Sequence, residues 1–106
     1  MILEDRIVKI KDVLINKNAE DVSDFDTRDS EYFVDSVVIA SSRGDRHTNA
    51  LLEHLKEFLP HEELLRVDSS NSWIVVDFGD ILVHLMSKES RDKYSLESFL
   101  HKYQEK

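Results

Sequence analysis

The chain has 106 residues, of which 41% are hydrophobic and 34% are charged, and its formal net charge is −8. This length fits one domain with a single core, and the apolar content is sufficient to pack it. Residues 1–86 carry 9 basic against 18 acidic side chains, whereas residues 87–106 carry 5 against 4. The acidic excess argues against binding a bare phosphate backbone or a specific nucleic-acid sequence, and it favours a basic partner.

The sequence contains no cysteine, which excludes disulfides, a thiolate nucleophile and a cysteine-based zinc site. No apolar stretch approaches the roughly 20 residues that span a bilayer, and the N-terminus lacks the apolar run of a signal peptide. We therefore expect a soluble, cytoplasmic protein with no membrane partner.

The N-terminal part predicts a helix over residues 2–15, because apolar residues recur at helical spacing along it. They are Leu3, Ile7, Ile10 and Leu14. Residues 16–18 end the helix, since asparagine tolerates the left-handed conformation there. Residues 19–31 carry six acidic side chains and predict a short edge strand near Asp21 to Asp26, followed by a loop. The spacing of a calcium-binding loop and its glycine are both absent, so this stretch is interpreted as a solvated acidic face.

The middle of the chain predicts a strand, a helix and a second, shorter strand. The first strand covers Tyr32 to Ser41, and its continuous apolar centre indicates burial on both faces. A turn over residues 42–45 leads into the helix, with Ser42 or Asp45 as the N-cap, and a proline at position 60 stops it. The helix would bury Leu51, Leu55, Phe58 and Leu59. A short strand over Leu64 to Val67 and a polar loop over residues 68–72 follow.

Residues 73–97 predict a β-hairpin followed by a short polar helix. The two strands flank a turn at Gly79, and alternation assigns their side chains to opposite faces. Ile74, Val76 and one apolar set from the returning strand are sufficient for the core. This leaves Trp73, Asp77 and His84 for a surface. Tryptophan is enriched at binding hot spots, but the pattern equally allows Trp73 to be a core residue.

No catalytic set accompanies these residues. Asp77 and His84 fall on neighbouring strands, but no serine, cysteine or third metal ligand stands at a suitable spacing. Phosphate-binding glycine motifs are also absent. We therefore predict no catalytic residue, no cofactor and no metal site.

Two blocks of the sequence resemble the ribosomal silencing factor family, also called the Iojap family. The first is the strand Asp35 to Ser41 with the turn and helix after it. The second combines typed residues of the hairpin with others of the segment after it, namely Trp73, Asp77, Gly79, Asp80, Val83, His84, Arg91, Tyr94, Leu96 and Glu97. The resemblance extends from the N-terminal helix to Glu97. Three positions depart from the family pattern: Ser36, the Val67-Asp68 pair and Leu100.

The resemblance implies an α/β fold: a single small domain over residues 1–106, with a mixed β-sheet flanked by helices. Its topology would be that of the nucleotidyltransferases without their catalytic acids, and residues 98–106 would form a helical or frayed tail. It also implies a translation repressor rather than an enzyme. Such a protein binds the large ribosomal subunit through ribosomal protein L-fourteen and sterically blocks joining with the small subunit.

The residues predicted to bind the partner come from this second block. Trp73 and Phe78 would make apolar contacts. Three carboxylates would face basic groups of the partner: Asp77, Asp80 and Glu97. Four further residues complete the set, as contacts or as internal supports of the corner between hairpin and helix: His84, Arg91, Tyr94 and Leu96.

Two other classes remain as alternatives: a nucleotidyltransferase-type enzyme and a generic adaptor or oligomerisation module without a ribosomal role. The turn over residues 41–45 is a poor match to the glycine-serine turn that such an enzyme needs. The sequence also leaves open a homodimer formed through an edge strand or the exposed hairpin face, and whether the main effect is silencing or assistance to subunit assembly.

Overall fold

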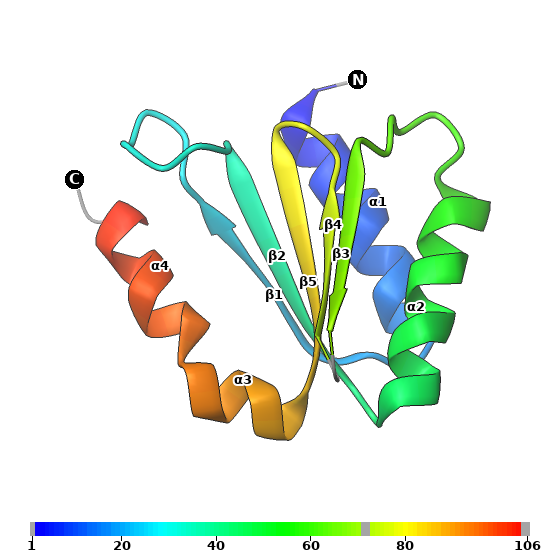
Figure 1. The fold of residues 1–106 in the computed structure, drawn as a ribbon. Coiled ribbons are helices and arrows are strands. Elements are labelled where there is room, and N and C mark those ends of the chain that lie inside the picture. The colour runs from blue at the N-terminus through cyan, green and yellow to red at the C-terminus, as the bar shows by residue number, and fades with distance from the viewer. Residues whose placement is uncertain (1, 71–72, 105–106) are drawn as a thin grey trace.

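The fold is a five-stranded mixed sheet with strand order β1-β2-β5-β4-β3 (Figure 1). The computed structural model describes residues 2–70 and 73–104. The strands are β1 (Glu20–Asp26), β2 (Ser36–Ser42), β3 (Arg66–Ser70), β4 (Trp73–Asp77) and β5 (Ile81–Ser87). Strands β2 and β5 pair in parallel, and every other pair is antiparallel. The predicted mixed α/β architecture is confirmed.

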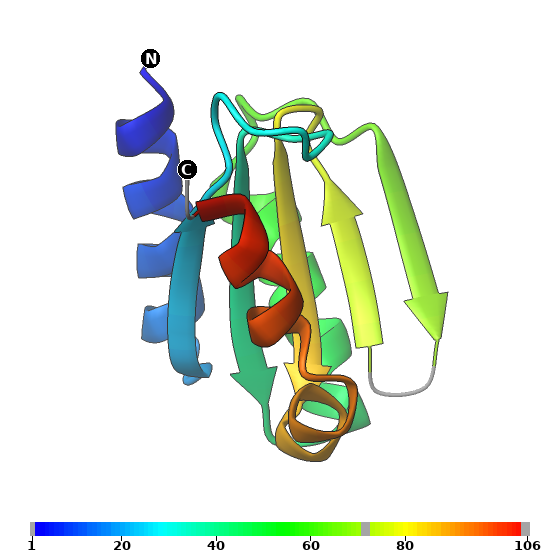
Figure 2. The same cartoon turned by 90° about the vertical axis from the view of Figure 1, so that its left-hand side faces the viewer.

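Helices cover the two faces of the sheet unequally. Helices α1 (Leu3–Asn16) and α2 (Asp45–Phe58) pack on one face, and α3 (Lys88–Tyr94) and α4 (Leu96–Gln104) pack on the other. Figure 2 shows α3 and α4 lying over the β1, β2 and β5 half of the sheet. None of the described helices lies over the β4 and β3 half of that face.

Two apolar clusters form the core, one on each side of the sheet. The cluster beneath α1 and α2 contains the predicted helix residues Ile10 and Leu14 and the Leu51 to Leu59 stripe. The cluster beneath α4 contains Phe25, Leu82, Met86 and Leu100. All residues of β2 are buried, which confirms that its continuous apolar run belongs to a strand covered on both faces.

Helix α1 and the hairpin also follow the predictions closely. Helix α1 ends at Asn16, and Asn18 adopts the left-handed conformation with φ of 69°. Ile74, Val76, Ile81, Val83 and Leu85 all lie in the cluster beneath α1 and α2. The residues that alternate with them along β4 and β5 face the other side of the sheet, as period-two alternation predicts.

Four local predictions are wrong. Strand β2 begins at Ser36 rather than Tyr32, because residues 27–35 close a loop in which Thr27 N donates to Asp35 O (2.9 Å). The N-cap of α2 is Gly44, since the Ser42 hydroxyl is bonded to Thr48 and Asp45 is already helical.

The other two wrong predictions concern the last residues of α2 and the strand that follows it. Phe58 is exposed, while Leu59, just beyond the helix, is buried. The third strand covers Arg66–Ser70 instead of Leu64–Val67, because its pairing with β4 starts at Arg66 opposite Asp77. Residues 68–70, predicted as loop, therefore lie in a strand, and residues 71–72 lie outside the described residues.

Candidate partner-binding site

A tight turn holds the two hairpin strands in register. Phe78 N donates to Ile81 O (2.9 Å), and the Asp77 carboxylate accepts a bond from Gly79 N (2.7 Å). Gly79 has φ of 94°, a backbone conformation that residues other than glycine rarely adopt. With this register, Trp73 faces Met86 and Val75 faces His84 on the neighbouring strand.

Trp73 is held at the border of the uncovered half of the sheet by two aromatic neighbours. Its indole Nε1–H donates to His84 Nδ1 (3.0 Å). Its ring lies 4.9 Å from the ring of Tyr94, between centroids. Trp73 is half-buried and Tyr94 is 53% exposed, so both retain accessible aromatic surface. A buried contact on one side and accessible surface on the other suit an anchor of fixed orientation.

His84 lies inside the protein. Burial lowers its pKa from 6.5 to about 4. Because Nδ1 accepts the indole proton, the neutral ring carries its own proton on Nε2, which is buried without a hydrogen-bond partner among the described residues. Of the two roles that the sequence leaves open for His84, this environment favours internal support of Trp73.

Arg91 anchors the corner between α3 and α4 to the sheet. Its guanidinium donates to Glu97 Oε1 (2.6 Å), to the backbone oxygen of Asp21 (2.6 Å) and to Ser41 Oγ (2.9 Å). Arg91 is buried, and Leu96 packs against the cluster beneath α4. These contacts favour a supporting role for Arg91 and Leu96. Glu97 keeps a partly exposed carboxylate beside them.

Phe78 and Asp80 are separated from Trp73. Phe78 is 7% exposed and lies in the core cluster beneath α1 and α2, on the opposite face of the sheet. Asp80 is bound by Arg6 of α1 (2.6 and 2.9 Å), which also binds Glu62 (2.7 and 2.9 Å). The hydrogen bonds from Arg6 lower the pKa of the Asp80 carboxyl. Because Phe78 is buried in this structure, its side chain is not accessible for the predicted apolar contact with a partner.

The structure brings β3 into the candidate site, which the sequence analysis missed. Direct pairing places Ser70 beside Trp73, Asp68 beside Val75 and Arg66 beside Asp77. Directly opposed residues share one face of a sheet, so these six residues form one surface, which we call the open sheet face. No local pattern marks this strand, because Val67 is the one apolar residue in residues 66–70.

The open sheet face has the character of a recognition surface. It combines an aromatic anchor with polar and charged groups, and the β3 residues on it are exposed. Among residues 2–70 and 73–104, no group of three histidine, aspartate or glutamate side chains is arranged to hold a metal ion. None of the helices described has the length and apolar character needed to cross a membrane.

These features define a small mixed α/β domain whose distinctive surface is an open sheet face. Solved structures share this fold. A protein from Chromobacterium violaceum aligns with a TM-score of 0.88 at 22% identity, covering 95% of this chain and 88% of that one. A protein from Bacillus halodurans aligns with a TM-score of 0.79 at 22% identity, covering 91% and 93%.

Sequence comparison identifies the family. The family model described as "Ribosomal silencing factor during starvation" matches residues 3–106, and the chain belongs to this family. Ribosomal silencing factor RsfS of Treponema pallidum is 36% identical over 92 residues, covering 83% of each chain. The family consists of regulatory, ribosome-associated factors and not of enzymes.

Two organellar relatives are longer than this chain. "Mitochondrial assembly of ribosomal large subunit protein 1" of mouse is 28% identical over 92 residues, which is 80% of this chain and 40% of the mouse protein. "Protein Iojap-related, mitochondrial" of Arabidopsis thaliana is 29% identical over 98 residues, covering 85% and 53%. The chain thus spans about half, or less, of the length of these two relatives.

Proposed function

We propose that this protein binds the large ribosomal subunit through ribosomal protein L-fourteen and prevents the small subunit from joining. Membership in the silencing factor family supports a ribosomal role. The observation that carries the proposal is the open sheet face. There Trp73 is oriented by His84 and Tyr94, beside a half of the sheet that none of the helices in residues 2–70 and 73–104 covers (Figure 2).

Steric obstruction explains how such a surface would act. The protein has no need of a catalytic group, because a body of this size bound where the subunits meet would exclude the small subunit. The net charge of −8 favours association with a basic ribosomal protein. We also propose that the protein acts in the cytoplasm, where bacterial-type subunits join. A role in subunit assembly is likewise part of the proposal.

Within the proposed interface, Trp73 and Tyr94 make the apolar contact, while Asp77 and Glu97 face basic groups. Buried His84 and Arg91 act by holding those side chains in place. Phe78 and Asp80 contribute by fixing the hairpin turn. A homodimer through the same face is a further prediction, and it would compete with ribosome binding.

Co-sedimentation with isolated large subunits tests the proposal, with small subunits as a control. The unmodified chain is expected to move with large subunits only and to reduce joining in a light-scattering assay. Trp73→Ala is expected to weaken binding by about 2 kcal/mol, or about 30-fold. Phe33→Ala is the matched control, since Phe33 is 72% exposed on the loop before β2.

Three results would contradict the proposal at different levels. Failure to move with either subunit would remove the ribosomal role. Binding without any effect on joining would remove the obstruction mechanism. A folded Trp73→Ala variant that binds as tightly as the parent would remove Trp73 as the anchor.

A further inference from the structure

The loop between β1 and β2 carries the most exposed of the large apolar side chains that the structure describes. This side chain is Phe33, which is 72% exposed. Its ring lies 4.8 Å from the ring of Tyr32, which in turn lies 6.0 Å from the ring of Phe99 on α4. At the other end of this row of rings, Lys102 Nζ lies 5.5 Å from the centre of the Phe99 ring. One end of the row therefore already contacts a cation, and the end at Phe33 is exposed.

Hydrogen bonds at both ends of the loop position Phe33. Thr27 donates from its backbone nitrogen to Asp35 O (2.9 Å) and from its hydroxyl to Val34 O (2.6 Å). The backbone nitrogen of Asp35 donates to Asp80 O (2.9 Å) in the turn between β4 and β5. Figure 1 shows the loop close to the C-terminal end of α4. A ring that is positioned before binding loses little conformational entropy when a partner contacts it.

Three exposed carboxylates accompany Phe33 on the loop: Asp29, Glu31 and Asp35. Within residues 2–70 and 73–104, none of the three has an ion-pair partner. The one basic residue of the loop, Arg28, is bound to Asp26 (2.8 Å) and to Glu4 (2.7 Å). Two of the three acids flank Phe33 at a distance of two residues, so their Cα atoms lie within about 7 Å of its own.

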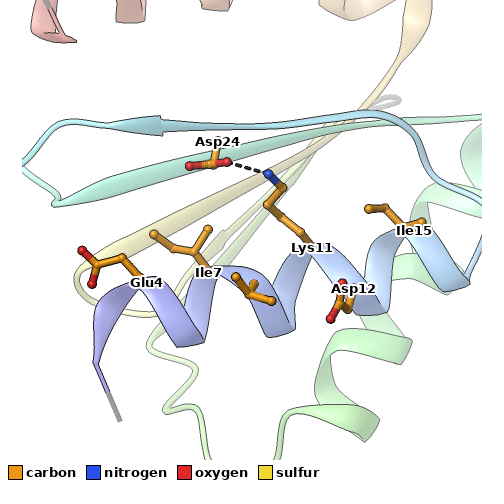
Figure 3. Close-up of a pocket in the computed structure, with 7 residues that line it drawn as sticks. Glu4, Ile7, Lys11, Asp12, Ile15 and Asp24 are labelled. Atoms are coloured by element: carbon orange, nitrogen blue, oxygen red, sulfur yellow. Dashed lines mark hydrogen bonds and ion pairs between the residues drawn. The ribbon is translucent and has the colours of Figure 1, made fainter.

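The groove between α1 and β1 is another exposed apolar surface, but most of its carboxylates are already paired. It has a volume of about 370 Å³, and Val8 and Ile15 contribute to its apolar lining. Figure 3 shows Lys11 bound to Asp24 there (2.6 Å), and Glu4 is bound to Arg28. Charge therefore selects no partner for the groove, whereas the carboxylates of the loop do favour one kind of partner.

A guanidinium group can bind the ring and the carboxylates of the loop at the same time. It is planar, so it stacks on an aromatic ring while its N–H groups donate to a carboxylate in its own plane. An ammonium group is a point charge and has no plane to stack. A nucleic acid fits poorly, because its phosphates would face three carboxylates.

We propose that the loop over residues 27–35 binds an arginine side chain in a basic segment of a partner protein. The guanidinium stacks on Phe33 and donates to the flanking carboxylates of Glu31 and Asp35. Further basic residues of the segment face Asp29.

This arginine site is separate from the open sheet face. The loop ends where Ser36 pairs with Ile81, whereas Trp73 pairs with Met86. These two positions on β5 are five residues apart, or about 17 Å along the strand. The site therefore goes beyond the proposed ribosomal function.

Nitrogen-15-labelled full-length protein titrated with synthetic peptides tests the site by NMR. The probe is a capped seven-residue peptide in which three arginines alternate with four glycines, and in the control peptide lysines replace the arginines. The arginine peptide is expected to shift amides of residues 29–35. At low salt it is expected to bind about fivefold tighter than the lysine peptide, because only the guanidinium stacks on the ring.

Variants of the protein separate the ring from the charges. Phe33→Leu is expected to remove the preference for arginine over lysine, and the pair Glu31→Gln and Asp35→Asn to weaken both peptides about tenfold. Phe58→Leu and Glu57→Gln are the matched controls, because they remove an exposed ring and an exposed carboxylate of α2. Neither control is expected to change the binding of either peptide.

Several results would overturn the proposal. They are the absence of binding, equal binding of the two peptides, shifts confined to the open sheet face, or an unchanged preference for arginine in folded Phe33→Leu. An equal loss of affinity in Glu57→Gln would show a general attraction to an acidic protein. Shifts of residues 29–35 on dilution of the free chain would make a second copy the occupant. If Phe33→Leu failed to fold, the acid pair measured against Glu57→Gln would decide the question.

Discussion

His84 makes the stability of this protein depend on pH in a way that the variant His84→Gln should abolish. The ring is buried on the sheet face that carries Trp73, and its Nδ1 accepts the indole N–H. Glutamine keeps an oxygen that accepts this bond but does not titrate. The comparison therefore isolates the proton from the hydrogen bond.

The expected size of the effect follows from the two pKa values of this side chain. Burial lowers the pKa of His84 to about 4 in the folded protein, whereas in the unfolded chain it titrates near 6.5. The folded-state value is depressed, so this stability is present above pH 6.5 and is lost as the pH falls toward 4. Each pH unit in that window costs about 1.4 kcal/mol, so the loss between pH 6.5 and pH 5 is about 2 kcal/mol.

Urea unfolding at pH 7 and pH 5 measures this difference, followed by the fluorescence of the chain's one tryptophan and by circular dichroism. The free energy of unfolding of the parent is expected to fall by about 2 kcal/mol more than that of His84→Gln. The many carboxylates affect both proteins alike and cancel in the comparison. Equal losses in the two proteins, or a His84 ring that titrates near 6.5 by NMR, would refute the reasoning.

Two further predictions concern the turn between β4 and β5: one replaces the arginine that binds it, and the other replaces the glycine within it. Arg6→Met removes the guanidinium from the carboxylate of Glu62, whose side chain is 3% exposed, and leaves it with His61 Nε2 at 3.7 Å. This change should lower the free energy of unfolding by about 3 kcal/mol. Adding Glu62→Gln should recover about 1 kcal/mol in urea unfolding; no recovery would show that the buried charge is not the cause. Gly79→Ala should cost about 1–2 kcal/mol, since φ is 94° and the new methyl group would lie 3.3 Å from Leu65 Cδ1. A thermal melt with an unchanged midpoint would contradict that estimate.

The elements with strong local patterns were predictable from the sequence. The alternation over residues 73–86 correctly separated the two faces of the hairpin, and the apolar run in β2 indicated burial on both faces. The alternation assigned only one hairpin face to a core, whereas the other face of β5 is buried in the cluster beneath α4. Alternation also assigned Phe78 to the same face as Ile74 and Val76. The hypothesis that Phe78 contacts a partner is inconsistent with that position. The structure confirms the position, because Phe78 is buried.

The features that local patterns cannot encode were missed. Arg91 bonds to the backbone of Asp21, 70 residues away, and no spacing rule connects these two positions. The limits of β3 were missed because its polar residues have the composition of a loop, and only the pairing with β4 makes them a strand. The sequence therefore predicted the β4 part of the open sheet face and missed the β3 part.

The parallel pairing of β2 with β5 has a consequence for synthesis of the protein. Ser36 and Ile81 are neighbours in the centre of the sheet but lie 45 residues apart in the chain. A nascent chain that ends before β5 therefore holds β1 and β2 on one side and β3 and β4 on the other, with nothing between them. Closing such long-range contacts is the slow part of folding. Both apolar clusters are completed only when β5 inserts, so a factor of the ribosomal silencing family acquires its working shape only after most of its own translation is over.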